Sequence, residues 1–157
     1  WEWNDVYKDV LPKELNDLLY TIGREQFVST YIQFLETQDG EGFDWFTSEH
    51  RTLLDQRQKE IEAYIKKKDE QLTVTDSNVG IIFAESHVSE LGNEICKLHP
   101  EIDYVVIFDV GARKMSFRTV KDIDLSEIAK SHDGGGHPKA SGASFQLPEL
   151  LTIIESF

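Results

Sequence analysis

The sequence predicts an α/β fold, in which a small mixed β-sheet with flanking helices follows a helical segment and a connecting helix. Three patterns support this class. Before residue 72, apolar residues recur at helical spacing. From residue 79, a short apolar run, a helix-like stretch and a second apolar run follow one another within about 30 residues. From residue 114, polar and apolar residues alternate as in a strand. A length of 157 residues fits one domain, or one domain with part of another.

The first 71 residues are expected to be helical. Apolar side chains at helical spacing predict helices over Leu11–Leu19 and Phe27–Leu35. Residues 47–71 contain no glycine or proline and have a thin apolar stripe, which is typical of a solvent-exposed connecting helix. The aromatic residues near both ends of segment 1–46 form either its own core or the edge of a larger core. We therefore expect a helical segment over 1–46 and a connecting helix over 47–71.

The rest of the chain, residues 72–157, is expected to form the sheet. The short apolar run Val79–Ala84 predicts a strand, and Val88–Leu98 has helical spacing that ends before Pro100. Tyr104–Phe108 is apolar throughout, which favours a central strand that is covered on both faces. Strand, helix and strand in this order predict a βαβ unit with a right-handed crossover.

A hairpin strand is expected after the turn at residues 110–113. The alternation over Lys114–Val120 places Met115, Phe117 and Thr119 on one face and Lys114, Ser116 and Arg118 on the other. Asp124–Glu127 is an Asp-x-x-Glu variant of the capping box and begins a short helix. A glycine loop follows, then a strand over Ser141–Gln146 and a terminal helix that begins at Pro148.

The composition favours a small anionic ligand over a long nucleic acid. The chain has 29 acidic and 16 basic residues, and its formal charge of −13 opposes sequence-independent binding to duplex nucleic acid. Residues 111–140 are an exception, because they include six basic and four acidic residues. No apolar run is long enough to cross a membrane, and Cys96 is the single cysteine. These features predict a reducing, cytoplasmic location.

The candidate binding site centres on three consecutive glycines. The run 134–136 places backbone N–H groups where they can surround an anion, and a histidine and a lysine follow at once. The alternative is a flexible surface turn. A serine and an arginine on the outward face of the hairpin strand favour the anion site, because a guanidinium binds phosphate through two hydrogen bonds. The predicted substrate-binding residues are Ser116, Arg118, Gly134, Gly135, Gly136, His137 and Lys139.

The sequence shows this binding site without a catalytic centre. No histidines and cysteines have the spacing of metal ligands, and no serine stands in a nucleophile motif with a histidine and an aspartate. Asp103 and Asp109 flank a strand, but a metal site would need further carboxylates that converge on them. We therefore predict neither catalytic residues nor a metal site in this chain.

Five motifs occur in the order and spacing of a known family: residues 89–93, the apolar strand 104–108, residues 115–118, residues 124–129 and the Gly-Gly-Gly-His segment 134–142. Over residues 74–157 the sequence resembles the C-terminal associated domain of the DHH phosphoesterases, and is similar to their bacterial oligoribonuclease and nucleotide bisphosphatase members. Segment 1–71 resembles the end of the family's catalytic DHH domain followed by the helix that joins the two domains.

The resemblance implies the substrate-binding part of a phosphoesterase that acts on short oligonucleotides, dinucleotides or nucleotide phosphates. In the family, hydrolysis uses two Mn²⁺ ions held by aspartates and histidines of the N-terminal DHH domain. By resemblance, Ser116, Arg118, the glycine run and His137 hold the substrate phosphate. The Asp-His-His motif is absent here, and Ser131-His132-Asp133 does not match it. We therefore expect Mn²⁺ in the intact enzyme, none bound by this chain, and no activity from this chain alone.

Other functions remain open from the sequence. Related Gly-Gly-Gly-His domains are appended to tRNA synthetases and single-strand nucleases, which makes a nucleic-acid or tRNA binding module one alternative. The acidic charge and the lack of an aromatic-basic stripe weigh against it. The other alternative is a domain of a cyclic-dinucleotide phosphodiesterase or sensor. The partners expected from the main hypothesis are a short oligonucleotide, dinucleotide or nucleotide phosphate and the N-terminal DHH domain of the same protein, with no membrane.

Overall fold

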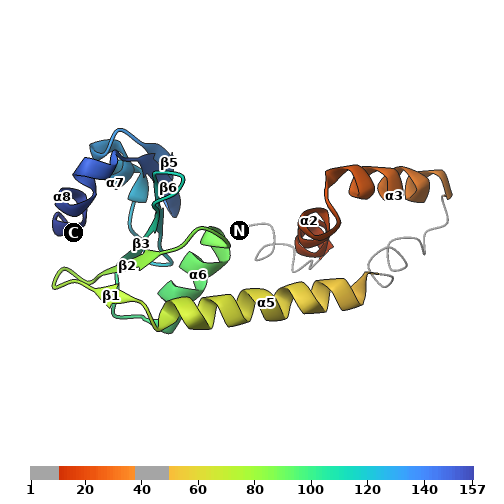
Figure 1. Cartoon of the computed structure of the whole chain (residues 1–157), viewed down its shortest axis with the longest axis horizontal. Coiled ribbons are helices and arrows are strands. Elements are labelled where there is room, and N and C mark those ends of the chain that lie inside the picture. Colours follow the sequence, from red (N-terminus) through yellow and green to blue (C-terminus); the bar gives the residue numbers. More distant parts are fainter. Residues whose placement is uncertain (1–10, 38–49) are drawn as a thin grey trace. The chain divides into compact units, whose positions relative to one another are not determined.

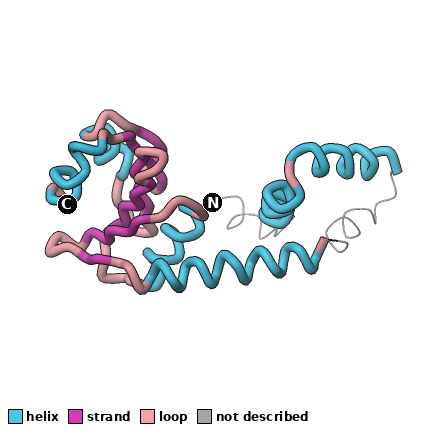
Figure 2. The backbone as a smooth tube through the Cα atoms, in the orientation of Figure 1, coloured by secondary structure: helices cyan, strands magenta, loops and turns pink. Residues whose placement is uncertain are grey.

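The computed structural model describes residues 11–37 and 50–157. Contacts within the chain divide it into two units, residues 1–60 and 61–157. Figure 1 labels the helices and strands, and Figure 2 shows the same elements by type. The aromatic residues that the sequence places near both ends of segment 1–46 lie outside the described residues.

The described part of the first unit is helical, as predicted. It includes α2 (Leu11–Ile22), α3 (Arg24–Thr37) and the first part of α5 (Arg51–Asp69). Gly23 separates α2 from α3. Its φ of +81° is a backbone conformation that glycine adopts readily because it has no Cβ. Leu18 of α2 and Leu54 of α5 are buried together. Of the long polar helix predicted over residues 47–71, the structure shows Arg51–Asp69 as α5, and residues 47–49 lie outside the described residues.

The second unit is built on a six-stranded mixed sheet with the order β1-β2-β3-β4-β6-β5. Its strands are β1 (Thr73–Val74), β2 (Val79–Phe83), β3 (Tyr104–Asp109), β4 (Lys114–Arg118), β5 (Gly135–His137) and β6 (Ala140–Ser144). Strands β2 and β3 are parallel and are joined by α6 (Val88–Leu98), whereas the other pairs are antiparallel. The α/β class, the βαβ unit and the hairpin are confirmed.

Two hydrophobic layers cover the two faces of this sheet. One packs β2 and β3 against α6 and the second half of α5, and the other packs β3 and β4 against α7 (Leu125–Ser131) and α8 (Leu150–Glu155). In the first layer, α6 contacts β3 and β4, while α7 on the other face contacts β4, β5 and β6. Figure 1 shows α6 on one side of the strands and α7 and α8 on the other. The α6 side of β5 and β6 therefore has no packed helix from the described part of this unit.

Both helix starts near the C-terminus follow local capping chemistry. The carboxylate of Asp124 accepts the backbone N–H of Ser126 at 2.9 Å, which caps α7 as expected. The carboxylate of Glu127 accepts a hydrogen bond from the ammonium of Lys130 at 2.6 Å. The predicted capping box would instead have Glu127 accept the backbone N–H of Asp124. The terminal helix predicted from Pro148 begins as a 3-10 turn, Leu147–Glu149, and continues as α8.

A histidine ion pair links the end of α5 to the loop after α6. His99 Nε2 lies 2.6 Å from Asp69 Oδ1, and its Nδ1 lies 3.1 Å from Glu101 Oε1. The hydrogen bond to Asp69 is the largest cause that raises the pKa of His99 above its ordinary value. A group whose pKa rises on folding stabilises the fold fully below its unfolded pKa, and this contribution is lost as pH rises through the folded pKa.

We expect the unfolding free energy to fall as pH increases from about 6.5 through the raised pKa of His99. His99→Gln should remove this part of the pH dependence, because glutamine does not titrate. Urea denaturation at a series of pH values measures it. Asp69→Asn should flatten the same part of the curve, and identical slopes for the wild type and both variants would contradict the assignment.

Candidate functional site

The sheet register brings four predicted site residues onto one face. Ser116 of β4 is aligned with Gly142 of β6, which is aligned with Gly135 of β5. In the same way Arg118 is aligned with Ala140, and Ala140 with His137. Paired residues point to the same side of a sheet. We call this surface the β4–β6–β5 face, and it comprises Lys114, Ser116, Arg118, Gly135, His137, Ala140, Gly142 and Ser144.

Arg118 is held at the junction of this face with α6. Its Nη1 donates to the carbonyl oxygens of Phe117 at 2.8 Å and Ser141 at 3.3 Å, and its Nη2 donates to Ser89 Oγ at 3.3 Å. Burial lowers the pKa of its guanidinium, and the negative charge of Glu90 raises it in part. An arginine keeps its positive charge at neutral pH even so. The group is a fixed cation with donors left for an anion, since a guanidinium has five N–H groups.

The close approach of α6 to Arg118 depends on a glycine. A Cβ atom on Gly92 would lie 2.5 Å from Arg118 Cγ and 2.8 Å from Arg118 Cβ. Such distances are far below van der Waals contact, so any larger residue would displace the arginine stem or the helix. Gly92 and Ser89 therefore position Arg118 from the facing helix.

The three consecutive glycines have different structural roles. A Cβ on Gly134 would lie 2.2 Å from the carbonyl oxygen of Gly142, and one on Gly136 would lie 2.6 Å from Ser141 Cα. Gly136 also has a φ of +143°. Packing and backbone conformation thus require glycine at both positions. Gly135 has no atom within 4 Å of the place where a Cβ would stand, so the fold leaves open space there.

The predicted glycine loop is partly a strand. Gly135–His137 pair with Ala140–Gly142 at the sheet edge. Pairing with β6 decides the conformation here, although glycine has little preference for strands. The segment is also tied to α7, because Gly134 N donates to Ala129 O at 2.8 Å and Leu125 N donates to Pro138 O at 2.8 Å. The three glycines are therefore held at the edge of the sheet by backbone hydrogen bonds, which disfavours the alternative of a flexible surface turn.

His137 and Lys139 follow the edge strand but face different partners. The backbone N–H of Lys139 donates to His137 Nδ1 at 3.2 Å, so in the neutral ring Nε2 is the protonated nitrogen. The imidazole is exposed on the β4–β6–β5 face. The ammonium of Lys139 donates to the carbonyl oxygen of Lys121 and lies 3.3 Å from Asp122 Oδ1. The structure thus places Lys139 in a polar contact with the loop before α7.

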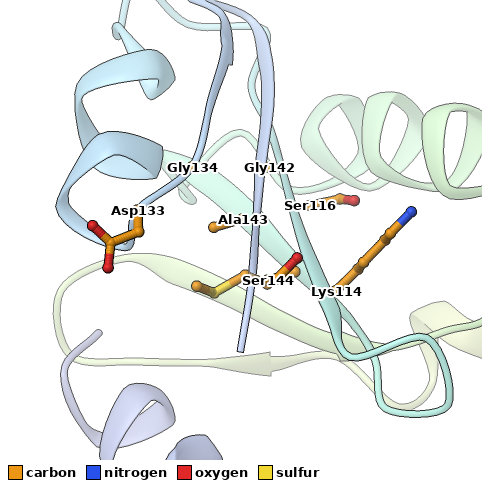
Figure 3. A pocket seen from close by; sticks show the side chains of 8 residues that line it. Lys114, Ser116, Asp133, Gly134, Gly142, Ala143 and Ser144 are labelled. Atoms are coloured by element: carbon orange, nitrogen blue, oxygen red, sulfur yellow. The ribbon is translucent and has the colours of Figure 1, made fainter. Parts of the chain in front are cut away.

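A pocket of about 290 Å³ lies at the other end of the same strands. Figure 3 shows Lys114 and Ser116 pointing to one side of β6, while the carboxylate of Asp133 points to the other. Of the predicted site residues, Ser116 and Gly134 line this pocket, and Arg118 and His137 lie beyond it along the strands. The lining residues are Lys114, Met115, Ser116, Asp133, Gly134, Gly142, Ala143 and Ser144.

The described residues do not offer the ligands of a Mn²⁺ pair. Within residues 11–37 and 50–157, no three histidine, cysteine, aspartate or glutamate side chains are grouped so that they could hold a metal ion. Mn²⁺ prefers carboxylate and imidazole ligands that converge on one point. In the same ranges, no helix is both long and apolar enough to cross a membrane. On the β4–β6–β5 face, the guanidinium of Arg118 is a group that can bind an anion.

Sequence reasoning did not identify three residues that the structure adds to this surface. Ser89 and Gly92 come from α6, and their contact with Arg118 follows from the packing of a helix on a strand far along the chain. Lys114 belongs to the predicted outward face of its strand and lies outside the predicted site. Its spacing of two residues from Ser116 indicates that the two side chains share a face.

Comparisons with known proteins show what this chain is similar to. Residues 27–157 match the family model described as the DHHA1 domain. The whole chain is 42% identical, over 163 aligned positions, to the Oligoribonuclease NrnB of Bacillus subtilis (strain 168), and it spans 40% of the length of that protein.

Solved structures show the same fold at low sequence identity. RecJ in complex with Mn²⁺ from Thermus thermophilus is 15% identical, with a TM-score of 0.63 over 90% of this chain and 22% of that one. An exonuclease RecJ bound to manganese is 19% identical, with a TM-score of 0.55 over 81% of this chain and 34% of that one. The family match over most of the chain shows that this chain belongs to the DHHA1 domain family.

Proposed function

We propose that this chain binds the phosphate of short nucleotide substrates for a Mn²⁺-dependent DHH phosphoesterase whose metal ligands lie in another domain of the same protein. The observation that supports this most is the β4–β6–β5 face, where a fixed arginine, an open glycine and an exposed histidine lie on the same side of the sheet. The 42% identity to a protein named oligoribonuclease favours short oligonucleotides as the substrate class.

Each residue has a definite task in this proposal. Arg118 provides a permanent positive charge and free N–H donors for phosphate oxygens. Gly135 lets the phosphate approach the backbone of β5, because no side chain occupies that space. The backbone N–H of Lys139 donates to His137 Nδ1, so Nε2 carries the proton of the neutral ring. His137 then donates a hydrogen bond to the phosphate from Nε2. Ser116 adds a hydroxyl between these groups and the pocket.

We further propose a division of labour along the chain. Residues 72–157 form the substrate-binding domain, residues 47–71 the connecting helix, and residues 1–46 the helical end of the catalytic DHH domain. In the intact protein, the catalytic DHH domain would hold Mn²⁺, and the two domains would close over a bound nucleotide. Cys96 is buried and burial raises its thiol pKa, so it makes an unreactive thiol that suits a reducing cytoplasm.

Binding and turnover of the purified chain test this function. We expect the chain to bind AMP and a 5′-phosphorylated diadenylate weakly and to release no phosphate from either with Mn²⁺ present. Calorimetric titration measures the binding, and chromatography of the products measures hydrolysis. Tighter binding of tRNA or of a long single strand would support the nucleic-acid module. Sustained Mn²⁺-dependent turnover by this chain would overturn the division of labour.

A further inference from the structure

We propose that Lys139 is a positioning residue, which holds the imidazole of His137 in one orientation and one tautomer. Its ammonium fastens the turn between β5 and β6, and its backbone N–H then fixes the ring. This inference rests on the proposed function, which takes His137 as a group that donates to the phosphate. It gives Lys139 a role different from the direct substrate contact that the sequence predicts.

The turn between β5 and β6 has little support of its own. His137 is aligned with Ala140, so Pro138 and Lys139 are the two central residues of the turn. Two-residue turns that match the twist of a hairpin need a positive φ at the first central residue. The proline ring instead fixes φ at about −65°, and neither central residue has a positive φ. This turn therefore depends on contacts from outside the hairpin.

The segment 119–125, which leads from β4 into α7, supplies backbone contacts to both central residues. The backbone N–H of Leu125 donates to the carbonyl oxygen of Pro138 at 2.8 Å. The backbone N–H of Thr119 donates to the carbonyl oxygen of Lys139 at 3.3 Å. Both bonds hold carbonyl groups of the turn, so the side chain of Lys139 is the next contact that can fix its position.

The ammonium of Lys139 is fastened to the same segment. It donates to the carbonyl oxygen of Lys121 and lies 3.3 Å from Asp122 Oδ1. The Asp122 side chain is fully exposed, so this ion pair contributes little and the carbonyl group is the main partner. Lys121 is itself held, because its backbone N–H donates to Oγ1 of the buried Thr119 at 3.0 Å. A direct bond from Lys139 to a phosphate would break this contact.

The position of the turn determines the state of the His137 ring. The backbone N–H of Lys139 donates to His137 Nδ1 at 3.2 Å. This contact requires an unprotonated Nδ1, so the neutral ring carries its proton on Nε2. If the ammonium were released, the backbone of Lys139 could rotate and its N–H would turn away from Nδ1. The lysine side chain therefore acts on a bound anion through His137.

Replacing Lys139 with methionine removes the ammonium and keeps the length of the side chain. We expect AMP affinity to fall about three- to fivefold. In a His137→Ala background the same change should have little further effect, because Lys139 acts through that imidazole. Lys139→Arg should restore most of the affinity, since a guanidinium can donate to the same carbonyl oxygen. Calorimetric titration measures all four variants.

The matched control for charge is Lys130→Met. Lys130 is an exposed lysine of α7 that is paired with Glu127 at 2.6 Å. Its replacement removes the same charge as Lys139→Met without touching the turn. We expect AMP affinity to change less than twofold, because exposed charges are screened at physiological salt.

Nuclear magnetic resonance tests the positioning without any ligand. A ¹H–¹⁵N correlation spectrum of the imidazole nitrogens at about pH 8.5, where an ordinary histidine is neutral, reports which nitrogen carries the proton. The spectrum of His137→Ala identifies the signals of His137. We expect the Nε2-protonated tautomer in the wild type and in Lys130→Met, and a mixture of both tautomers in Lys139→Met.

The outcomes separate positioning from direct binding. If Lys139→Met weakens AMP binding equally with and without the His137 imidazole, Lys139 contacts the phosphate itself and the inference is overturned. An unchanged tautomer in Lys139→Met overturns it as well. If the wild-type chain does not bind AMP, the proposed function fails, and the imidazole spectra still decide whether Lys139 holds His137.

Discussion

Replacing Gly134 with alanine should lower the free energy of unfolding of the sheet unit by about 2–4 kcal/mol. A Cβ at this position would stand 2.2 Å from the carbonyl oxygen of Gly142 and 2.6 Å from Ala143 Cβ. These atoms belong to the neighbouring strand, so the clash cannot be relieved by turning a flexible side chain. Either β5 separates from β6 or the hydrogen bond from Gly134 N to Ala129 O is lost. Urea denaturation followed by circular dichroism measures the loss.

Gly135→Ala is the matched control for that change. The space around Gly135 is open and its backbone has no positive φ, so alanine should keep or slightly raise the stability. Its methyl group would instead occupy the place where we propose that a phosphate approaches β5, and we expect AMP affinity to fall about five- to tenfold. Equal stability losses in both variants would contradict the distinction between a packing glycine and a binding glycine.

Replacing Arg118 with alanine should weaken AMP binding by roughly 10- to 100-fold, because a charge-assisted hydrogen-bond donor is removed from the site. The stability loss should be smaller, about 1 kcal/mol, since two of its three protein hydrogen bonds are as long as 3.3 Å. Arg118→Lys should restore only part of the affinity, because an ammonium lacks the planar fork of the guanidinium. Calorimetric titration at low and high salt provides both the affinity and its electrostatic part.

A nearby arginine provides the control for net charge. Arg113 lies in the β3–β4 turn with a φ of +56°, a conformation that asparagine tolerates. Arg113→Asn removes the same charge as Arg118→Ala without touching the β4–β6–β5 face. We expect it to change AMP affinity less than twofold at physiological salt, where exposed charges are screened. If both variants weaken binding equally, the effect of Arg118 is long-range charge alone.

The central sheet could be predicted because its strands bury whole side chains at a fixed period. Tyr104–Phe108 became β3, with Val105 through Phe108 buried, as a continuous apolar run predicts. Met115, Phe117 and Thr119 are buried on alternate positions, as predicted, which also placed Ser116 and Arg118 on the opposite face. Local patterns decide these elements, so one sequence contains enough information for them.

The parts that could not be predicted depend on contacts between distant residues. Nothing in the residues Gly135–His137 favours a strand, and the β5 conformation comes from backbone pairing with β6. The position of the Lys139 ammonium depends on the loop at Lys121 and Asp122, which is not visible from its neighbours in the sequence. The support of Arg118 by Gly92 likewise joins residues that are 26 positions apart. Tertiary packing, rather than residue type, determines all three.

The short strands at the two borders of the sheet also protect the protein from self-association. An unpaired border exposes backbone N–H and C=O groups, which another chain can extend into a larger sheet. Here the borders are β1, with two residues, and β5, with three residues of which two are glycine. Such strands offer few hydrogen bonds to an incoming chain and no flat apolar surface. The two glycines of β5, one of which is Gly135 of our proposed phosphate site, therefore also make this border a poor template for aggregation.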